Sequence, residues 1–155
     1  MKWESSKRYV LNYDRATMIS AAIPGSSVEA IDYPALLNPY DTSSFNGTQT
    51  TTRQLMSYVD KCSKARVVLL GYSQGAHIVG DVMCGGRGSI ALGPSTPPIA
   101  KKYQDKVVAM IQMGDPRHLP AKSFDVGSSQ NMGVSSDPPC FQNTSNRGID
   151  ISATR

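Results

Sequence analysis

The feature that most constrains the fold of this sequence is the segment 65–75, which reads A-R-V-V-L-L-G-Y-S-Q-G. Its short β-branched and apolar run, Val67 to Leu70, is typical of a buried strand and ends near a serine with a glycine two residues away on each side. The residues from Gln74 to about Cys84 have helical spacing. The segment therefore predicts a strand that passes through a sharp turn at Ser73 into a helix.

A strand, a G-x-S-x-G turn and a helix in this order are typical of the nucleophile elbow of serine hydrolases. We expect Gly71 and Gly75 to remove Cβ atoms that would clash with the backbone of such a turn. The first N–H groups of a helix lack intrahelical acceptors and carry positive partial charge, so the N–H of Gln74 is expected to stabilise an oxyanion beside Ser73. The alternative interpretation is a chance match, which the flanking strand and helix patterns disfavour.

Hydrophobic periodicity and turn residues predict further helices and strands along the chain. Additional helices are predicted at Arg15 to Ile23 and from about Thr50 to Cys62, and additional strands at Val28 to Tyr33 and Val107 to Met113. On the second helix, Leu55, Met56, Val59 and Cys62 are expected to share one buried face. Loops are expected from Pro34 to about Gly47 and from Arg117 onward. Alternating strands and helices indicate a parallel sheet with helices on both faces, in which ligands bind beyond the carboxyl ends of the strands.

Length and composition fit a single domain over residues 1–155, because 39% of the 155 residues are hydrophobic. We expect neither membrane insertion nor nucleic-acid binding, since no apolar run approaches the roughly 20 residues of a membrane span and the 16 basic and 12 acidic residues are scattered. The opening M-K-W-E-S-S-K-R lacks the apolar core of a secretory signal. The three cysteines lack the spacing of a metal site, and no metal or cofactor is expected.

Three blocks in order resemble fungal cutinases and acetylxylan esterases: I-P-G-S-S-V-E-A-I-D-Y-P-A (23–35), V-V-L-L-G-Y-S-Q-G-A-H-I-V-G-D-V-M-C-G (67–85) and V-V-A-M-I-Q-M-G-D-P-R-H (107–118). The resemblance covers about residues 18–140, whereas 1–17 and 141–155 diverge. It implies a three-layer α/β/α sandwich with a central parallel sheet, the small cutinase-like α/β-hydrolase fold. It also implies a secreted, monomeric serine esterase that acts on plant cell-wall esters, either cutin or acetylated xylan. Within it, Ser73 matches the nucleophile, and Gln74 matches the residue whose backbone N–H forms half of the oxyanion hole.

The sequence also departs from the family pattern. The region before Met18 shows neither the family's cysteine and first strand nor the Ser or Thr that supplies the second oxyanion donor. After Cys140, where the family continues to its catalytic Asp and His, this chain runs F-Q-N-T-S-N-R-G-I-D-I-S-A-T-R. We therefore expect a fold that is incomplete at both ends and an impaired activity. Cys84 and Cys140 match a family disulfide, which leaves Cys62 as a free thiol.

A serine nucleophile needs a histidine base, and the sequence holds two histidines. His77 lies one helical turn after Ser73, where a packing role is the more natural reading. His118 follows a predicted strand end and is the better candidate base, with Asp115 to orient it, although an Asp before a proline is more often a turn former. The competing hypothesis is a non-catalytic relic that binds plant polysaccharide or a protein. An interfacial lipase is less favoured, because no extended apolar lid segment is visible.

Overall fold

The computed structural model describes residues 10–134 and 148–151, with side chains described from Arg15 to residue 134. The chain divides into two compact units, 1–30 and 31–155, each of which is described by itself. The first unit contains helix α1 (Val10–Ala22), so the predicted helix is confirmed in type and begins earlier than expected. The assignment of all 155 residues to one domain stays a prediction.

The second unit is built on a parallel four-stranded sheet in the order β1-β2-β4-β3. Its strands are β1 (Val67–Tyr72), β2 (Val107–Met113), β3 (Asp125–Val126) and β4 (Gly148–Ile151). The prediction of a parallel sheet, with its two longest strands, is thereby confirmed. Strands β3 and β4 lie in the part predicted to be loop, and that prediction is wrong at these two places. They are too short, and too rich in flanking Ser, Gly and Asn, to show an alternating pattern.

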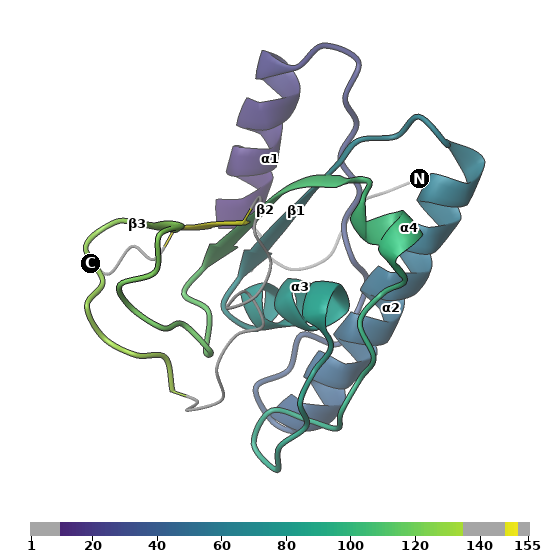
Figure 1. Cartoon of the computed structure of the whole chain (residues 1–155). Helices are drawn as coiled ribbons and strands as arrows, with labels where there is room; N and C mark the ends of the chain where they lie inside the picture. The colour runs from purple at the N-terminus through teal and green to yellow at the C-terminus, as the bar shows by residue number, and fades with distance from the viewer. Residues whose placement is uncertain (1–9, 135–147, 152–155) are drawn as a thin grey trace. The chain divides into compact units, whose positions relative to one another are not determined.

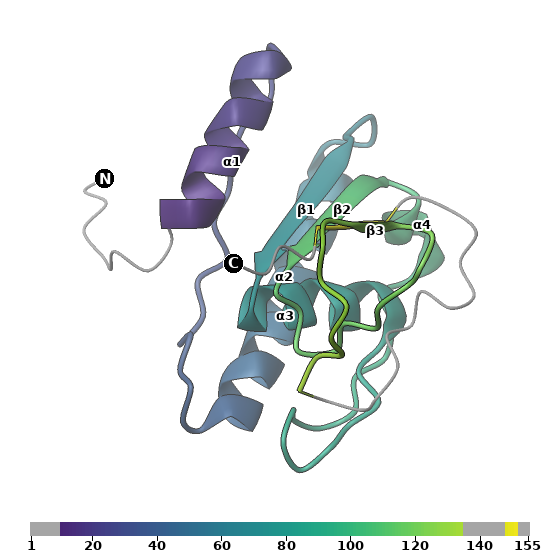
Figure 2. The ribbon, with the colours of Figure 1, turned by 90° about the vertical axis from the view of Figure 1, so that its left-hand side faces the viewer.

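Two helices pack in succession beside the sheet. Helix α3 (Gln74–Cys84) contacts both β1 and β2, and helix α2 (Tyr40–Lys61) contacts α3 (Figure 1; Figure 2). The short helix α4 (Lys101–Gln104) contacts α2 and precedes β2. One apolar core joins these elements, with buried members Leu55, Val59, Leu69, Val79, Val82, Ile99, Tyr103, Val107 and Met110.

Helix α2 begins at Tyr40, ten positions before the expected start, so the loop predicted up to Gly47 is wrong beyond Pro39. Ser, Thr, Asn and Gly fill this first half, and they are weak helix formers, which explains the error. Their small size lets α2 approach α3 closely: a Cβ atom built at Gly47 would lie 2.3 Å from Cδ1 of Ile78. The buried threonine hydroxyls are satisfied within the helix: Thr48 donates to the carbonyl oxygen of Ser44 at 3.1 Å, and Thr51 to that of Gly47 at 2.8 Å.

Two other expectations about this region are wrong. No strand forms at Val28 to Tyr33, where the described backbone has no regular secondary structure and takes part in no sheet ladder. An alternating pattern forms a strand only when a neighbouring strand supplies hydrogen-bond partners. On α2, Leu55 and Val59 are buried one turn apart, whereas Met56 lies beside that stripe and is exposed. Cys62 follows the stripe in spacing, but it is the C-cap residue after the end of α2 and is exposed.

None of the described helices is both long enough and apolar enough to cross a membrane.

Candidate active site

The turn between β1 and α3 has the geometry that the G-x-S-x-G pattern predicts. Ser73 stands between the last residue of β1 and the first residue of α3, with φ 53° and ψ −119°. A positive φ is strained for a residue that carries a Cβ atom, at a cost of roughly 1–3 kcal/mol. The Ser73 N–H donates to the carbonyl oxygen of Met113 at 2.8 Å, which ties the turn to the carboxyl end of β2. The strained turn at the sheet edge is therefore confirmed.

The two glycines of the motif differ in their surroundings. A Cβ atom at Gly71 would lie 2.4 Å from the carbonyl oxygen of Gly75 and 2.6 Å from both N and Cα of Ala76, all of which are backbone atoms. At Gly75, by contrast, a Cβ atom would have no described atom within 4 Å. The expectation is thus confirmed for Gly71 and wrong for Gly75, because the side of α3 on which Gly75 lies is open.

The groups that would react are available at this turn. Ser73 is half-buried, and its hydroxyl has no hydrogen-bond partner among the described residues. The N–H of Gln74, the first residue of α3, likewise has no acceptor among them, as expected for a helix start. A free hydroxyl beside a free amide donor can support attack on a carbonyl and stabilisation of the resulting oxyanion. The catalytic roles of Ser73 and Gln74 stay predictions.

The Gln74 side chain is held by a closed set of three hydrogen bonds, which we call the Ser43–Gln74 ring. The Leu36 N–H donates to Oγ of Ser43 at 2.9 Å, and the Ser43 hydroxyl donates to Oε1 of Gln74 at 3.0 Å. Nε2 of Gln74 closes the ring by donating to the carbonyl oxygen of Leu36 at 2.9 Å. Ser43 and Gln74 are buried, with 1% and 6% exposure. The ring connects α2, α3 and the segment that precedes α2.

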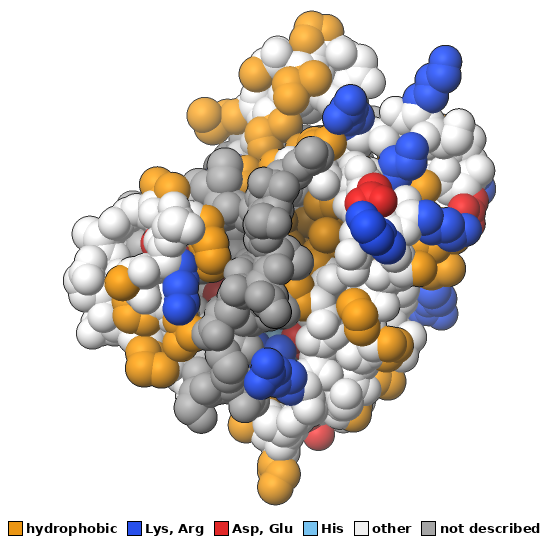
Figure 3. Space-filling model, in the orientation of Figure 1, with side chains coloured by type: hydrophobic (Ala, Val, Ile, Leu, Met, Phe, Trp, Pro, Cys, Tyr) orange, Lys and Arg blue, Asp and Glu red, His pale blue; other side chains and the backbone are white. Residues whose placement is uncertain are grey.

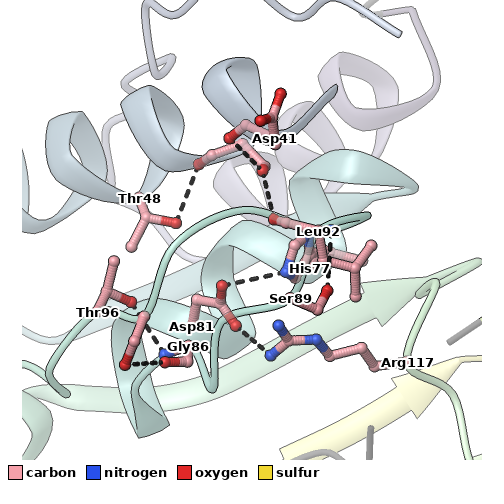
Figure 4. Close-up of polar contacts among 12 residues, drawn as sticks. Asp41, Thr48, His77, Asp81, Gly86, Ser89, Leu92, Thr96 and Arg117 are labelled. Carbon is pink, nitrogen blue, oxygen red and sulfur yellow. Dashed lines mark hydrogen bonds and ion pairs between the residues drawn. The ribbon is translucent and has the colours of Figure 1, made fainter. Parts of the chain in front are cut away.

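His77 belongs to a buried polar network and not to an open base position (Figure 4). Its Nδ1 lies 3.2 Å from the Tyr40 hydroxyl, and its Nε2 lies 3.1 Å from Oδ2 of Asp81. The approach of Nε2 to Asp81 is within ion-pair distance but lacks hydrogen-bond geometry, and Nε2 has no hydrogen-bond partner among the described residues. Oδ1 of Asp81 pairs with Nη1 of Arg117 at 2.5 Å. The buried ring therefore lies between Tyr40 and Asp81, which supports the packing role.

Tyr40 closes this network at the start of α2. Its ring stacks on the His77 imidazole, with centroids 5.9 Å apart. Burial, reinforced by the negative charge of Asp115, raises the pKa of the Tyr40 hydroxyl well above its ordinary value, so the hydroxyl remains a donor. Sequence reasoning missed Tyr40, Asp81 and Arg117. The one sequence signal for this network was the spacing of four residues between His77 and Asp81, which places the two side chains on the same face of a helix.

The candidate base and acid lie just beyond β2. Asp115 is buried, and its Oδ1 accepts from the N–H of Arg117 at 2.9 Å while its Oδ2 accepts from Nε2 of Gln112 at 3.2 Å. These bonds are those of a turn-forming aspartate. His118 is buried at 5% exposure, and its N–H donates to the carbonyl oxygen of Asp115 at 3.0 Å. Their roles as acid and base stay predictions.

Only part of the prediction about the three cysteines falls on described residues. Cys62 is an exposed free thiol, as expected. Cys140 lies outside the described residues, so the disulfide between Cys84 and Cys140 stays a prediction. Over the described side chains, no group of three or more His, Cys, Asp or Glu residues is placed to hold a metal ion. Lys and Arg side chains on the face shown in Figure 3 stand in separate groups and form no continuous patch there.

Fold and site together define a class: an α/β protein with a serine on a strained turn at the carboxyl edge of a parallel sheet. Residues 12–147 match the Cutinase family, and the chain belongs to that family. It is 32% identical over 133 residues to cutinase 11 of Verticillium dahliae, covering 80% of this chain and 45% of that protein. It is 31% identical over 137 residues to an acetylxylan esterase of Hypocrea jecorina, covering 81% and 45%. The chain thus spans about half the length of these curated relatives.

Solved structures agree with this family assignment. The catalytic core domain of acetyl xylan esterase from Trichoderma reesei superposes with a TM-score of 0.80 at 27% identity, covering 97% of this chain and 76% of that one. The predicted cutinase-like α/β-hydrolase fold is therefore confirmed.

Proposed function

We propose that this chain is a carboxylic ester hydrolase in which Ser73 is the nucleophile and the N–H of Gln74 is an oxyanion donor. The observation that carries the proposal is the strained backbone of Ser73, with φ 53°, at a strand-to-helix turn that leaves its hydroxyl unbonded among the described residues. Proteins retain strain of this kind where the surrounding structure enforces it, and such positions cluster at active sites. An amide donor at the start of α3 lies directly beside this hydroxyl in the chain.

His118 is the residue of this chain that we propose as the base, with Asp115 to orient it. The sequence holds two histidines, and His77 is enclosed between Tyr40 and Asp81 at 1% exposure. Because Ser73 is hydrogen-bonded to Met113, the last residue of β2, the loop that begins at Gly114 starts next to the nucleophile. His118 is nonetheless buried, so we propose that turnover by the 155-residue chain is slow.

The substrate class follows from the relatives. Those reported above are called a cutinase and acetylxylan esterases, and we propose plant cell-wall esters, cutin or acetylated xylan, as substrates. We further propose that the protein acts outside the cell as a monomer, as the resemblance to fungal secreted esterases implies.

The test combines labelling with turnover. A fluorophosphonate probe should modify Ser73, as read by mass spectrometry of the labelled peptide, and the chain should hydrolyse p-nitrophenyl acetate. Ser73→Ala should abolish both signals, because the nucleophile is lost. His118→Ala should lower turnover by several orders of magnitude if it is the base, and should leave little above the uncatalysed rate.

Two results would change the assignment. If a folded chain is neither labelled nor active, Ser73 is not a nucleophile in it, and retention on xylan or cellulose would then favour the non-catalytic polysaccharide-binding alternative. If labelling occurs and His118→Ala is fully active, His118 is not the base.

A further inference from the structure

The N–H of Gln74 needs a fixed direction to serve as an oxyanion donor. As the first residue of α3, Gln74 gives its N–H to no carbonyl oxygen of the described chain. The peptide unit that carries this N–H is also joined to the strained Ser73. The carbonyl oxygen of the same peptide unit, that of Ser73, accepts from the N–H groups of Ala76 at 2.9 Å and His77 at 3.2 Å, so the helix holds this unit from its carbonyl side only.

The Gln74 side chain supplies a second restraint, on the other side of this residue. Both of its polar atoms are engaged in the Ser43–Gln74 ring, at 3.0 Å to Oγ of Ser43 and 2.9 Å to the carbonyl oxygen of Leu36. Ser43 is the centre of this arrangement, because its hydroxyl accepts from the Leu36 N–H while it donates to Gln74. At 1% exposure, Ser43 is shielded from water that could replace these bonds.

We propose that Ser43 is a positioning residue: through the Gln74 side chain it fixes the backbone N–H of Gln74 in the direction that an oxyanion formed at Ser73 requires. This role rests on the proposed function. A purely structural alternative is that the ring only holds the segment before α2, in which case loss of the Ser43 hydroxyl would loosen Leu36 and leave Gln74 unchanged.

The first arm of the test measures backbone order directly. In ¹⁵N relaxation experiments on the full chain, Ser43→Ala should lower the order parameter of the Gln74 N–H from about 0.85 toward 0.6, values typical of rigid and flexible backbone. Ser44→Ala is the matched control: Ser44 is equally buried, but its hydroxyl is bonded to the carbonyl oxygens of Leu92 and Asp41, away from the ring. Ser44→Ala should leave the Gln74 order parameter unchanged, and Ser43→Thr, which keeps a hydroxyl, should restore it.

The second arm measures turnover of p-nitrophenyl acetate. Loss of a whole oxyanion donor costs 10²–10³ in kcat, so a loosened donor should lower kcat about 10-fold in Ser43→Ala, with KM within about twofold of the unmodified chain. Ser44→Ala and Ser43→Thr should stay within about twofold of the unmodified kcat. Gln74→Met keeps the backbone N–H and removes both side-chain hydrogen bonds, so it should reproduce the effects of Ser43→Ala. It replaces Ser43→Ala in both measurements if Ser43→Ala does not fold.

The two arms separate the two proposals. A chain without turnover and without Ser73 labelling refutes the proposed function, and the order parameter then decides the positioning role alone. An unchanged Gln74 order parameter in Ser43→Ala and Gln74→Met, or an equal fall in Ser44→Ala, overturns the role of Ser43.

Discussion

Replacing each glycine of the G-x-S-x-G motif by alanine should give opposite effects on stability. At Gly71 the added Cβ atom would lie 2.4 Å from one backbone atom and 2.6 Å from two others, about 1 Å inside ordinary van der Waals contact. These atoms belong to the first turn of α3, so only a shift of the helix away from β1 can relieve the overlap. Such overpacking costs up to about 3 kcal/mol, which lowers the melting temperature of a domain of this size by about 6–12 °C.

At Gly75 the same substitution meets no described atom within 4 Å. Gly75 lies in the first turn of α3, where alanine is the better helix former by up to about 1 kcal/mol. Gly75→Ala should therefore be as stable as the unmodified chain or slightly more stable. It is the matched control for Gly71→Ala, since both variants add one methyl group two residues from Ser73.

The assay is thermal and urea unfolding followed by circular dichroism, with a refolding check so that free energies of unfolding can be compared. The reasoning is refuted if Gly71→Ala unfolds at the same temperature as the unmodified chain, or if the two variants are destabilised equally. Equal destabilisation would mean that the motif needs both glycines for one common backbone reason, contrary to the different surroundings in the structure.

Three more substitutions test the site. Ser73→Gly should raise the free energy of unfolding by about 1 kcal/mol, because glycine tolerates φ 53°, whereas Ser73→Ala should not; urea midpoints that agree for both would contradict backbone strain. Arg117→Met should cost about 3–5 kcal/mol by leaving the buried Asp81 carboxylate without its cation, and much less in an Asp81→Asn background, as a double-mutant cycle in urea would show. Because the pKa of Tyr40 is raised above its ordinary value of 10.0, the stability it contributes is complete below pH 10 and is lost as the pH rises further. Tyr40→Phe should thus lose less stability between pH 8 and pH 11 than the unmodified chain, while Tyr72→Phe, at an exposed tyrosine, should not differ from it in this respect.

The parts of the fold that could be predicted from the sequence are those with strong local signals. Strands β1 and β2, of six and seven residues, begin with the apolar runs 67–70 and 107–111, and α3 has helical spacing that ends at a glycine pair. The first half of α2 could not be predicted, because Ser, Thr and Gly favour turns in isolation and become helical here by packing closely against Ile78. Strands β3 and β4 depend on pairing with distant strands and have no local pattern.

The candidate site divides in the same way. Ser73 and Gln74 could be predicted from the sequence because the elbow is one contiguous motif. The buried network around His77 could not be predicted, since Tyr40 lies 37 positions from His77 in the sequence, and Arg117 lies 36 positions from Asp81. No pattern in the sequence relates such distant polar residues. Only the folded arrangement shows that the first histidine is buried in this network.

The strain at Ser73 also links the proposed chemistry to the stability of its surroundings. A cost of roughly 1–3 kcal/mol at one residue must be offset by contacts that are lost if the turn relaxes. Three such contacts are present: the bond from Ser73 to Met113, the close approach of Gly71 to α3, and the Ser43–Gln74 ring. The first contact comes from β2, the second is made between β1 and α3, and the third involves α2. Ser73 therefore keeps its reactive geometry only while α2 and β2 stay packed against the turn. Variants that loosen α2 or β2 should lose labelling of Ser73 before they unfold globally.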